Sequence, residues 1–171
     1  MKSVSFICCM AAAFLFISGC GYHIGYLGHP QIKSIAVAPV TNQTTVYNVA
    51  AEMRAMLAEQ FNVDGTYKLE NLRNADCILY ANVLNFTTTK VTDTSDEDEV
   101  VFRVVEWQAT VNVEFTVIIP GRKEPVIKKR AVTGSCLFQS TGDMETSRRN
   151  GARLACRQAA VTIVQYTTEA W

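Results

Sequence analysis

The most reactive side chains in this 171-residue sequence are its six cysteines. Cys8 and Cys9 lie in an apolar N-terminal run, whereas Cys77, Cys136 and Cys156 are spread over the rest of the chain. No two cysteines, and no cysteine and histidine, have the spacing of a zinc site. The three later cysteines can form one disulfide and leave one thiol, or remain free and buried as small apolar residues. We prefer the second interpretation.

The sixth cysteine, Cys20, has a different chemistry because of the residues before it. The stretch Ile17-Ser18-Gly19-Cys20 matches the lipobox of bacterial lipoproteins, with a branched apolar residue and two small ones before the cysteine. At such a site the thiol accepts a diacylglyceryl group, the chain is cut before the cysteine and the new amine is acylated. More than one acyl chain gives stable membrane anchoring. The alternative is an ordinary secretory signal with an incidental cysteine.

The residues that precede Cys20 have the features of a secretory signal. Lys2 gives a positive start, and the apolar run of residues 4–17 is shorter than the ~20 residues that a membrane-spanning helix needs. Gly21, in place of an aspartate, favours the periplasmic face of the outer membrane over retention in the inner membrane. We predict three segments: a removed signal (1–19), a lipidated cysteine with a short tether (20–31), and a single α+β domain (32–171).

Two groups of cations could bind phosphates or acidic surfaces. The first, called the basic hairpin below, comprises Arg122, Lys123, Lys128, Lys129 and Arg130. Five cations within nine residues can neutralise the phosphates of a glycolipid, or can rest on acidic loops of a barrel wall. They can also be the charges of an edge strand that resists aggregation. The second group, the arginine stripe (Arg149, Arg153 and Arg157), recurs every four residues and is interpreted as a solvated helix flank.

The sequence gives little support for catalysis, metal binding or nucleic-acid binding. His23 and His29 lie in the tether, and no nucleophile-elbow, phosphate-loop or zinc-protease pattern occurs. An acidic loop (Asp93, Asp96, Glu97, Asp98 and Glu99) lacks the glycine of a calcium-binding loop, so we interpret it as a solvated hairpin tip. Without Lys2 the chain has 15 basic and 16 acidic residues, which argues against a nucleic-acid partner. We predict a protein that is not an enzyme and needs no cofactor.

The hydrophobic pattern predicts a strand, a helix, a series of strands and a final helix. Strands are expected at 32–40, 67–70, 77–90, 107–117 and 126–138, a polar turn at 41–45, and helices at 49–61 and 144–170. Asn48 is the expected N-cap of the first helix, and Gly65 follows its end. On the second helix, Ala152, Cys156, Ala159, Ile163, Tyr166 and Ala170 have the spacing of a buried stripe.

One strand has an especially clear pattern. The apolar residues Ala109, Val111, Val113, Phe115 and Val117 alternate with polar ones, which indicates one buried and one wet face. Lys128 and Arg130 are expected to share a face of the following strand. Consecutive strands and two amphipathic helices predict an α+β two-layer sandwich. In it, two helices pack on one face of a mostly antiparallel sheet of four to five strands.

Several stretches together resemble the LPS-assembly lipoprotein family, LptE. They are the start Cys20-Gly21-Tyr22-His23-Ile24-Gly25, the stretch Ile32-Lys33-Ser34-Ile35-Ala36-Val37-Ala38-Pro39-Val40 with Asn42 and Thr44, and Asn74-Ala75-Asp76 before a strand. The order of elements agrees over nearly the whole mature chain. The first two stretches are the most specific, although other outer-membrane lipoproteins have a similar first strand and helix.

The resemblance implies a function in lipopolysaccharide export. It implies an outer-membrane lipoprotein that assembles and plugs a β-barrel partner, LptD, and contacts lipopolysaccharide during its insertion into the outer leaflet. The glycolipid contacts of the family are scattered basic residues, so the basic hairpin is a candidate only by its charge. An alternative function is regulation of a periplasmic cell-wall synthase, but such lipoproteins usually have a long disordered linker after the cysteine. A small hydrolase or lipid-modifying enzyme is a third class, disfavoured because the sequence shows no nucleophile–base pair.

Overall fold

The computed structural model describes residues 31–91, 105–140 and 143–169. In chain order the elements are β1 (Ser34–Val37), β2 (Thr41–Asn42), α2 (Val49–Asp64), β3 (Lys68–Leu69), β4 (Cys77–Lys90), β5 (Val105–Ile118), β6 (Ile127–Ser140) and α3 (Met144–Thr168). The predicted strand 77–90 and both predicted helices are therefore confirmed to within a few residues. The signal segment, Cys20 and the acidic loop lie outside the described residues.

The strands form one mixed six-stranded sheet in the order β3-β1-β4-β5-β6, with β2 paired beside β1 on β4. β4, β5 and β6 are antiparallel, as expected for consecutive hairpins, but β1 and β2 both run parallel to β4. The parallel part arises because α2 carries the chain back over the sheet before β3 and β4 begin. The expected count of four to five strands rises to six because Thr41 and Asn42, predicted as turn, pair with β4.

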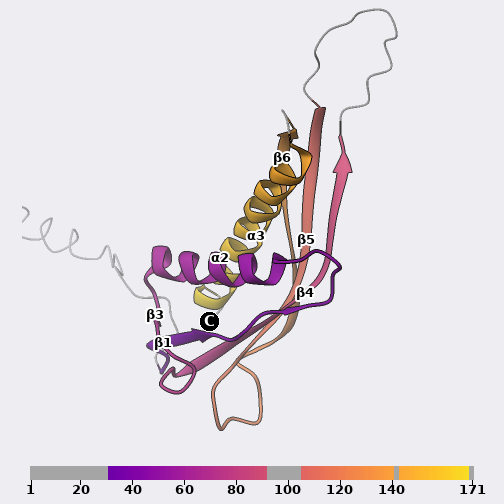
Figure 1. Ribbon diagram of the computed structural model, residues 1–171. Coiled ribbons are helices and arrows are strands. Elements are labelled where there is room, and N and C mark those ends of the chain that lie inside the picture. Colours follow the sequence, from indigo (N-terminus) through magenta and orange to yellow (C-terminus); the bar gives the residue numbers. More distant parts are fainter. Residues whose placement is uncertain (1–30, 92–104, 141–142, 170–171) are drawn as a thin grey trace, which may run out of the picture.

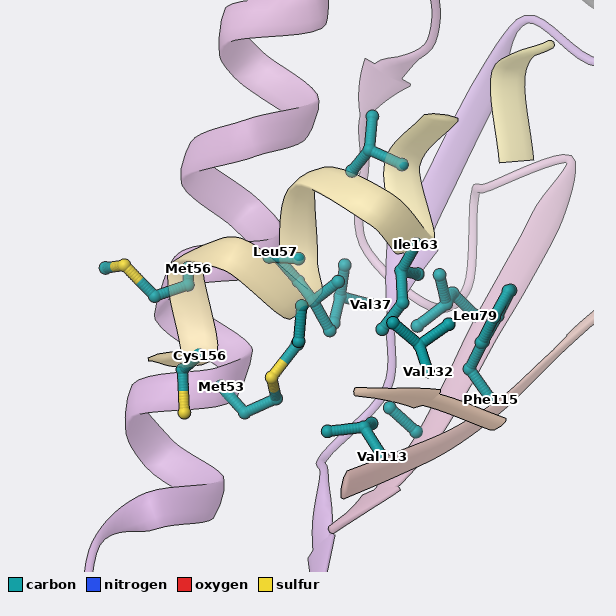
Figure 2. Close-up of a cluster of buried hydrophobic side chains, with 14 of the residues drawn as sticks. Val37, Met53, Met56, Leu57, Leu79, Val113, Phe115, Val132, Cys156 and Ile163 are labelled. Carbon is teal, nitrogen blue, oxygen red and sulfur yellow. The ribbon is translucent and has the colours of Figure 1, made fainter. Parts of the chain in front are cut away.

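The two helices cover one face of the sheet, so the predicted two-layer architecture is confirmed. Figure 1 shows α3 running along the long strands and α2 lying across α3. The larger of two buried clusters in the described residues joins both helices to the sheet (Figure 2). Its labelled members are Val37, Met53, Met56, Leu57, Leu79, Val113, Phe115, Val132, Cys156 and Ile163. The alternation predicted for β5 is also confirmed, because Ala109, Val111, Val113, Phe115 and Val117 are all buried.

The ends of α2 agree only partly with the sequence prediction. Gly65 ends the helix in the left-handed conformation at φ 70°, and its N–H donates to the Phe61 carbonyl at 3.0 Å. Asn48 occupies the N-cap position, but its side chain makes no capping hydrogen bond because its backbone is left-handed, with φ 71°. The predicted capping function of Asn48 is therefore wrong.

The start of α3 gives a physical reason for a glycine within a helix. Asp143 is the N-cap, and its carboxylate accepts hydrogen bonds from the N–H groups of Glu145 and Thr146. Gly151 costs the helix ~1 kcal/mol relative to alanine. However, a Cβ at this position would lie only 2.5 Å from Cδ1 of Phe138 on β6. The glycine therefore allows α3 to approach the sheet closely.

Asp76 connects the start of β4 to β1. Its carboxylate accepts hydrogen bonds from Lys33 N–H at 2.9 Å, Ser34 N–H at 3.0 Å and the Ser34 hydroxyl at 3.0 Å. The Lys33 N–H contributes most, ahead of the Ser34 hydroxyl, to holding the pKa of Asp76 below its ordinary value. The Asn74-Ala75-Asp76 stretch therefore has a structural function in the first parallel pair.

Replacing Asp76 with alanine is expected to lower the free energy of unfolding by about 1 kcal/mol at pH 7, because the site is exposed to water. A depressed pKa contributes stability above the ordinary aspartate pKa of about 4, and this stability is lost as the pH falls through the lower folded value. The difference between wild type and Asp76→Ala should therefore shrink below pH 4. Urea unfolding at pH 7 and pH 3 measures it. A difference in unfolding free energy that does not depend on pH would contradict the prediction. The control is Asp64→Ala, which removes an exposed carboxylate at the end of α2.

Candidate functional site

The basic hairpin lies at the turn between β5 and β6 and in the first residues of β6. Gly121 has φ 85°, and the Arg122 N–H donates to the Ile119 carbonyl at 3.1 Å, so the turn is tight. All five cations are exposed. The Arg122 Nη2 donates to Gln31 Oε1 at 3.3 Å, and Figure 1 shows the turn at the end of the sheet where β1 lies. The hairpin is therefore close to the start of the domain.

The five cations do not form one patch. Lys129 extends over the outer sheet face, where its Nζ lies 3.1 Å from Glu114 Oε1. Arg130 is the strand-register partner of Phe115, whose side chain is in the core. The guanidinium of Arg130 lies 4.3 Å from the ring centroid of Tyr166 on α3. Lys123 and Lys128 have no ion pair within the described part of the chain. Arg122, Lys123 and Lys128 are therefore the members available to an outside anion.

A register shift near the turn explains this separation. Phe115 pairs with Arg130 and Val117 with Ile127, so β6 has one more residue than β5 between these pairs. An extra residue interrupts the regular alternation of faces. The shared face expected for Lys128 and Arg130 assumed that alternation, and it stays a prediction.

Tyr166 is a residue that the sequence analysis misplaced. It was predicted within the buried stripe of α3, but it is 40% exposed, and its ring makes a cation–π contact with the Arg130 guanidinium. Thr167 takes its place in the core, with its hydroxyl donating to the Ile163 carbonyl at 2.7 Å. With Thr162, Gln165 and Glu169, the Arg130–Tyr166 pair lines an open recess beside the hairpin.

The arginine stripe is exposed on α3, as a solvated flank would be. Arg153 and Arg157, with Met56, Glu59, Asn150 and Leu154, line a shallow recess between the helices. None of the three arginines forms an ion pair with another described residue, whereas the neighbouring Arg148 lies 2.8 Å from Glu145. The stripe and the basic hairpin belong to different parts of the surface.

The three later cysteines are free thiols, in agreement with the preferred interpretation, although Cys136 is only half-buried. Burial raises the pKa of Cys77 to about 12, with Asp76 adding to the effect, and raises that of Cys156 to about 12, with Glu52 adding. Such thiols contain roughly a thousandfold less thiolate than ordinary ones. They are suited to packing and not to nucleophilic chemistry.

In residues 31–91, 105–140 and 143–169, no three histidine, cysteine or acidic side chains lie close enough to share a metal ion. Neither α2 nor α3 combines the length and the apolar character that crossing a bilayer requires.

The described residues form a small α+β domain in which two helices cover one face of a mixed sheet. The family model described as "LptE: Lipopolysaccharide-assembly" matches residues 32–167. The chain therefore belongs to the LptE family, and the resemblance seen in the sequence is confirmed. A comparison with curated protein sequences found no significant match.

Solved structures agree in fold. A minor lipoprotein from Acinetobacter baumannii is similar with a TM-score of 0.52 at 12% identity, over 81% of this chain and 94% of that one. A hypothetical protein from Chlamydia trachomatis has a TM-score of 0.54 at 12% identity, over 82% and 99%. A protein from Xanthomonas campestris has a TM-score of 0.52 at 14% identity, over 82% and 89%. At these identities the likeness establishes the fold alone.

Proposed function

We propose that this chain is an outer-membrane lipoprotein, anchored at the periplasmic face through lipid on Cys20, that assembles and plugs a lipopolysaccharide-export β-barrel of the LptD type. It contacts lipopolysaccharide during insertion into the outer leaflet. The observation that carries the proposal is the family match over residues 32–167, which spans the described domain almost completely. The function is one of assembly and binding, without a catalytic step.

The position of the basic hairpin supports a contact with the glycolipid. Gln31, which Arg122 contacts, follows Cys20 by eleven residues, so the anchor lies within about 40 Å of the hairpin. Each Lys or Arg near an anionic lipid surface contributes about 1 kcal/mol of attraction. Arg122 can in addition bind a phosphate through two parallel hydrogen bonds. The hairpin therefore combines suitable charge with a tether short enough to keep it within reach of the membrane.

Reversing the three available cations tests the glycolipid contact. The variant Arg122→Glu/Lys123→Glu/Lys128→Glu is expected to bind purified lipopolysaccharide at least about tenfold more weakly, because attraction to phosphates becomes repulsion. Binding is measured by titration of the lipoprotein in mild detergent. The matched control reverses the arginine stripe, which carries the same number of charges on α3 and should change the affinity far less. Equal losses in the two variants would contradict a contact specific to the hairpin.

A further inference from the structure

β6 forms one edge of the sheet. It runs from Ile127 to Ser140, and among the described residues its only strand partner is β5. The opposite edge, β3, has only two residues. β6 therefore offers a long row of backbone N–H and C=O groups that point away from β5 without a strand to receive them.

Most of this edge lacks the usual protection against strand addition. Proteins block edges with charges, prolines or bulges, and β6 has its three cations and the register shift only at its beginning, up to Arg130. Residues 131–140 contain no charge and no proline. Thr133, Ser135 and Leu137 are exposed on the outer side of this stretch, Leu137 by 55%. This ten-residue stretch can accept another strand.

The position of α3 excludes a second copy of this chain as that strand. A Cβ on Gly134 would lie 2.2 Å from the Ala155 carbonyl oxygen and 2.6 Å from the Ala159 nitrogen, so α3 passes directly over β6. Paired strands are roughly 4.8 Å apart, whereas packed helices need roughly 8–10 Å between their axes. Two copies joined by β6 would bring their α3 helices into collision. The added strand must come from a segment without a helix on that face.

We propose that the free edge of β6, at residues 131–140, binds an extended, uncharged segment of the β-barrel partner as an additional strand. This inference rests on the proposed function for the identity of the partner. Main-chain hydrogen bonds supply the affinity, and alternate side chains of the added segment pack beside Leu137 on one face and beside Phe138 and α3 on the other. Figure 1 shows β6 along the margin of the sheet.

Amide hydrogen exchange of the lipoprotein, free and in its purified complex with the barrel, tests the hydrogen bonds directly. Alternate amides of residues 131–140 should exchange at least about tenfold more slowly in the complex, while those of β5 should be protected in both states. Unchanged exchange at residues 131–140 in an intact complex would overturn the inference and leave the proposed function standing. Equal protection in the free chain would also overturn it, because the edge would already be paired.

A pair of charge variants distinguishes the edge from the sheet face. Ser135 on β6 and Thr110 on β5 are register partners on the same outer face. Ser135→Lys should reduce the recovered barrel complex at least about tenfold, since a charge blocks strand addition, whereas Thr110→Lys should leave it nearly unchanged. Equal recovery of the two variants would overturn the edge contact. Recovery of no barrel by the wild type would overturn the proposed function and the inference together.

Discussion

Replacing Gly134 with alanine is expected to lower the free energy of unfolding by at least about 2 kcal/mol. The added methyl group would lie 2.2 Å from the Ala155 carbonyl oxygen, 2.6 Å from the Ala159 nitrogen and 2.8 Å from the Ala159 Cβ. Two of these atoms belong to the backbone of α3, so no side-chain rotation can relieve the contact. The helix must move away from β6, and urea unfolding of the mature chain measures the cost.

The neighbouring position supplies the control for this experiment. Ser135 is exposed on the outer face of β6, so Ser135→Ala should change the stability by no more than about 0.5 kcal/mol. If Gly134→Ala were as stable as Ser135→Ala, α3 could not lie directly over β6. The free edge of β6 would then be open to a second copy of the chain as well.

Truncating Phe115 to alanine is expected to cost about 3–5 kcal/mol, the largest effect of any single substitution considered. Phe115 is 1% exposed and lies near the end of β5, where Figure 2 shows it among Leu79, Val132 and Ile163. The truncation would leave a cavity between the sheet and α3. It would also remove the contacts that the ring makes with side chains of the sheet and of α3. Equilibrium unfolding in urea, followed by near-ultraviolet circular dichroism, reports the loss.

Thr110 lies on the opposite face of the same strand and provides the control. Replacing it with alanine changes the strand propensity without removing a fully buried side chain. It is only half-buried, so Thr110→Ala should cost less than about 1 kcal/mol. A similar loss for the two variants would mean that the helices do not cover the face that carries Phe115. The two-layer arrangement would then be incorrect.

The features that the sequence predicted well are those with a local periodic signal. The alternation from Ala109 to Val117 identifies the buried face of β5 because successive side chains of a strand point to opposite faces. The spacing of Ala152, Cys156 and Ile163 identifies the buried face of α3 for the same kind of reason. Such patterns do not specify which strand pairs with which. The parallel arrangement of β1 and β2 beside β4 therefore appeared only in the structure.

Individual side chains were mispredicted where tertiary contacts override the helical spacing or where the backbone departs from regular geometry. Tyr166 contacts Arg130 at the surface instead of entering the core, and the hydroxyl of Thr167 can be buried because the Ile163 carbonyl accepts its hydrogen bond. Asn48 has a suitable side chain for capping, but its backbone is left-handed and the side chain makes no hydrogen bond to the helix amides. Neither the burial of Thr167 nor the left-handed backbone of Asn48 can be predicted from the residue types alone.

The candidate site was only partly accessible from the sequence. Five cations close together in the chain indicated a candidate anion-binding hairpin, and all five are exposed in the structure. Lys129 contacts Glu114, Arg130 contacts Tyr166, and the other three cations remain available to an outside anion. This division depends on the register shift in β6 and on residues distant in the chain. The free edge of β6 likewise depends on strand order, which is a property of the whole sheet.

The most direct test of the central proposal is to capture the tagged lipoprotein from its native outer membrane in mild detergent and identify its partners by mass spectrometry. We expect a large β-barrel of the lipopolysaccharide-export type in stoichiometric amount. Recovery of the lipoprotein alone, or with a periplasmic cell-wall synthase, would contradict the barrel-plug function. In the second case the chain would be a regulator of cell-wall synthesis.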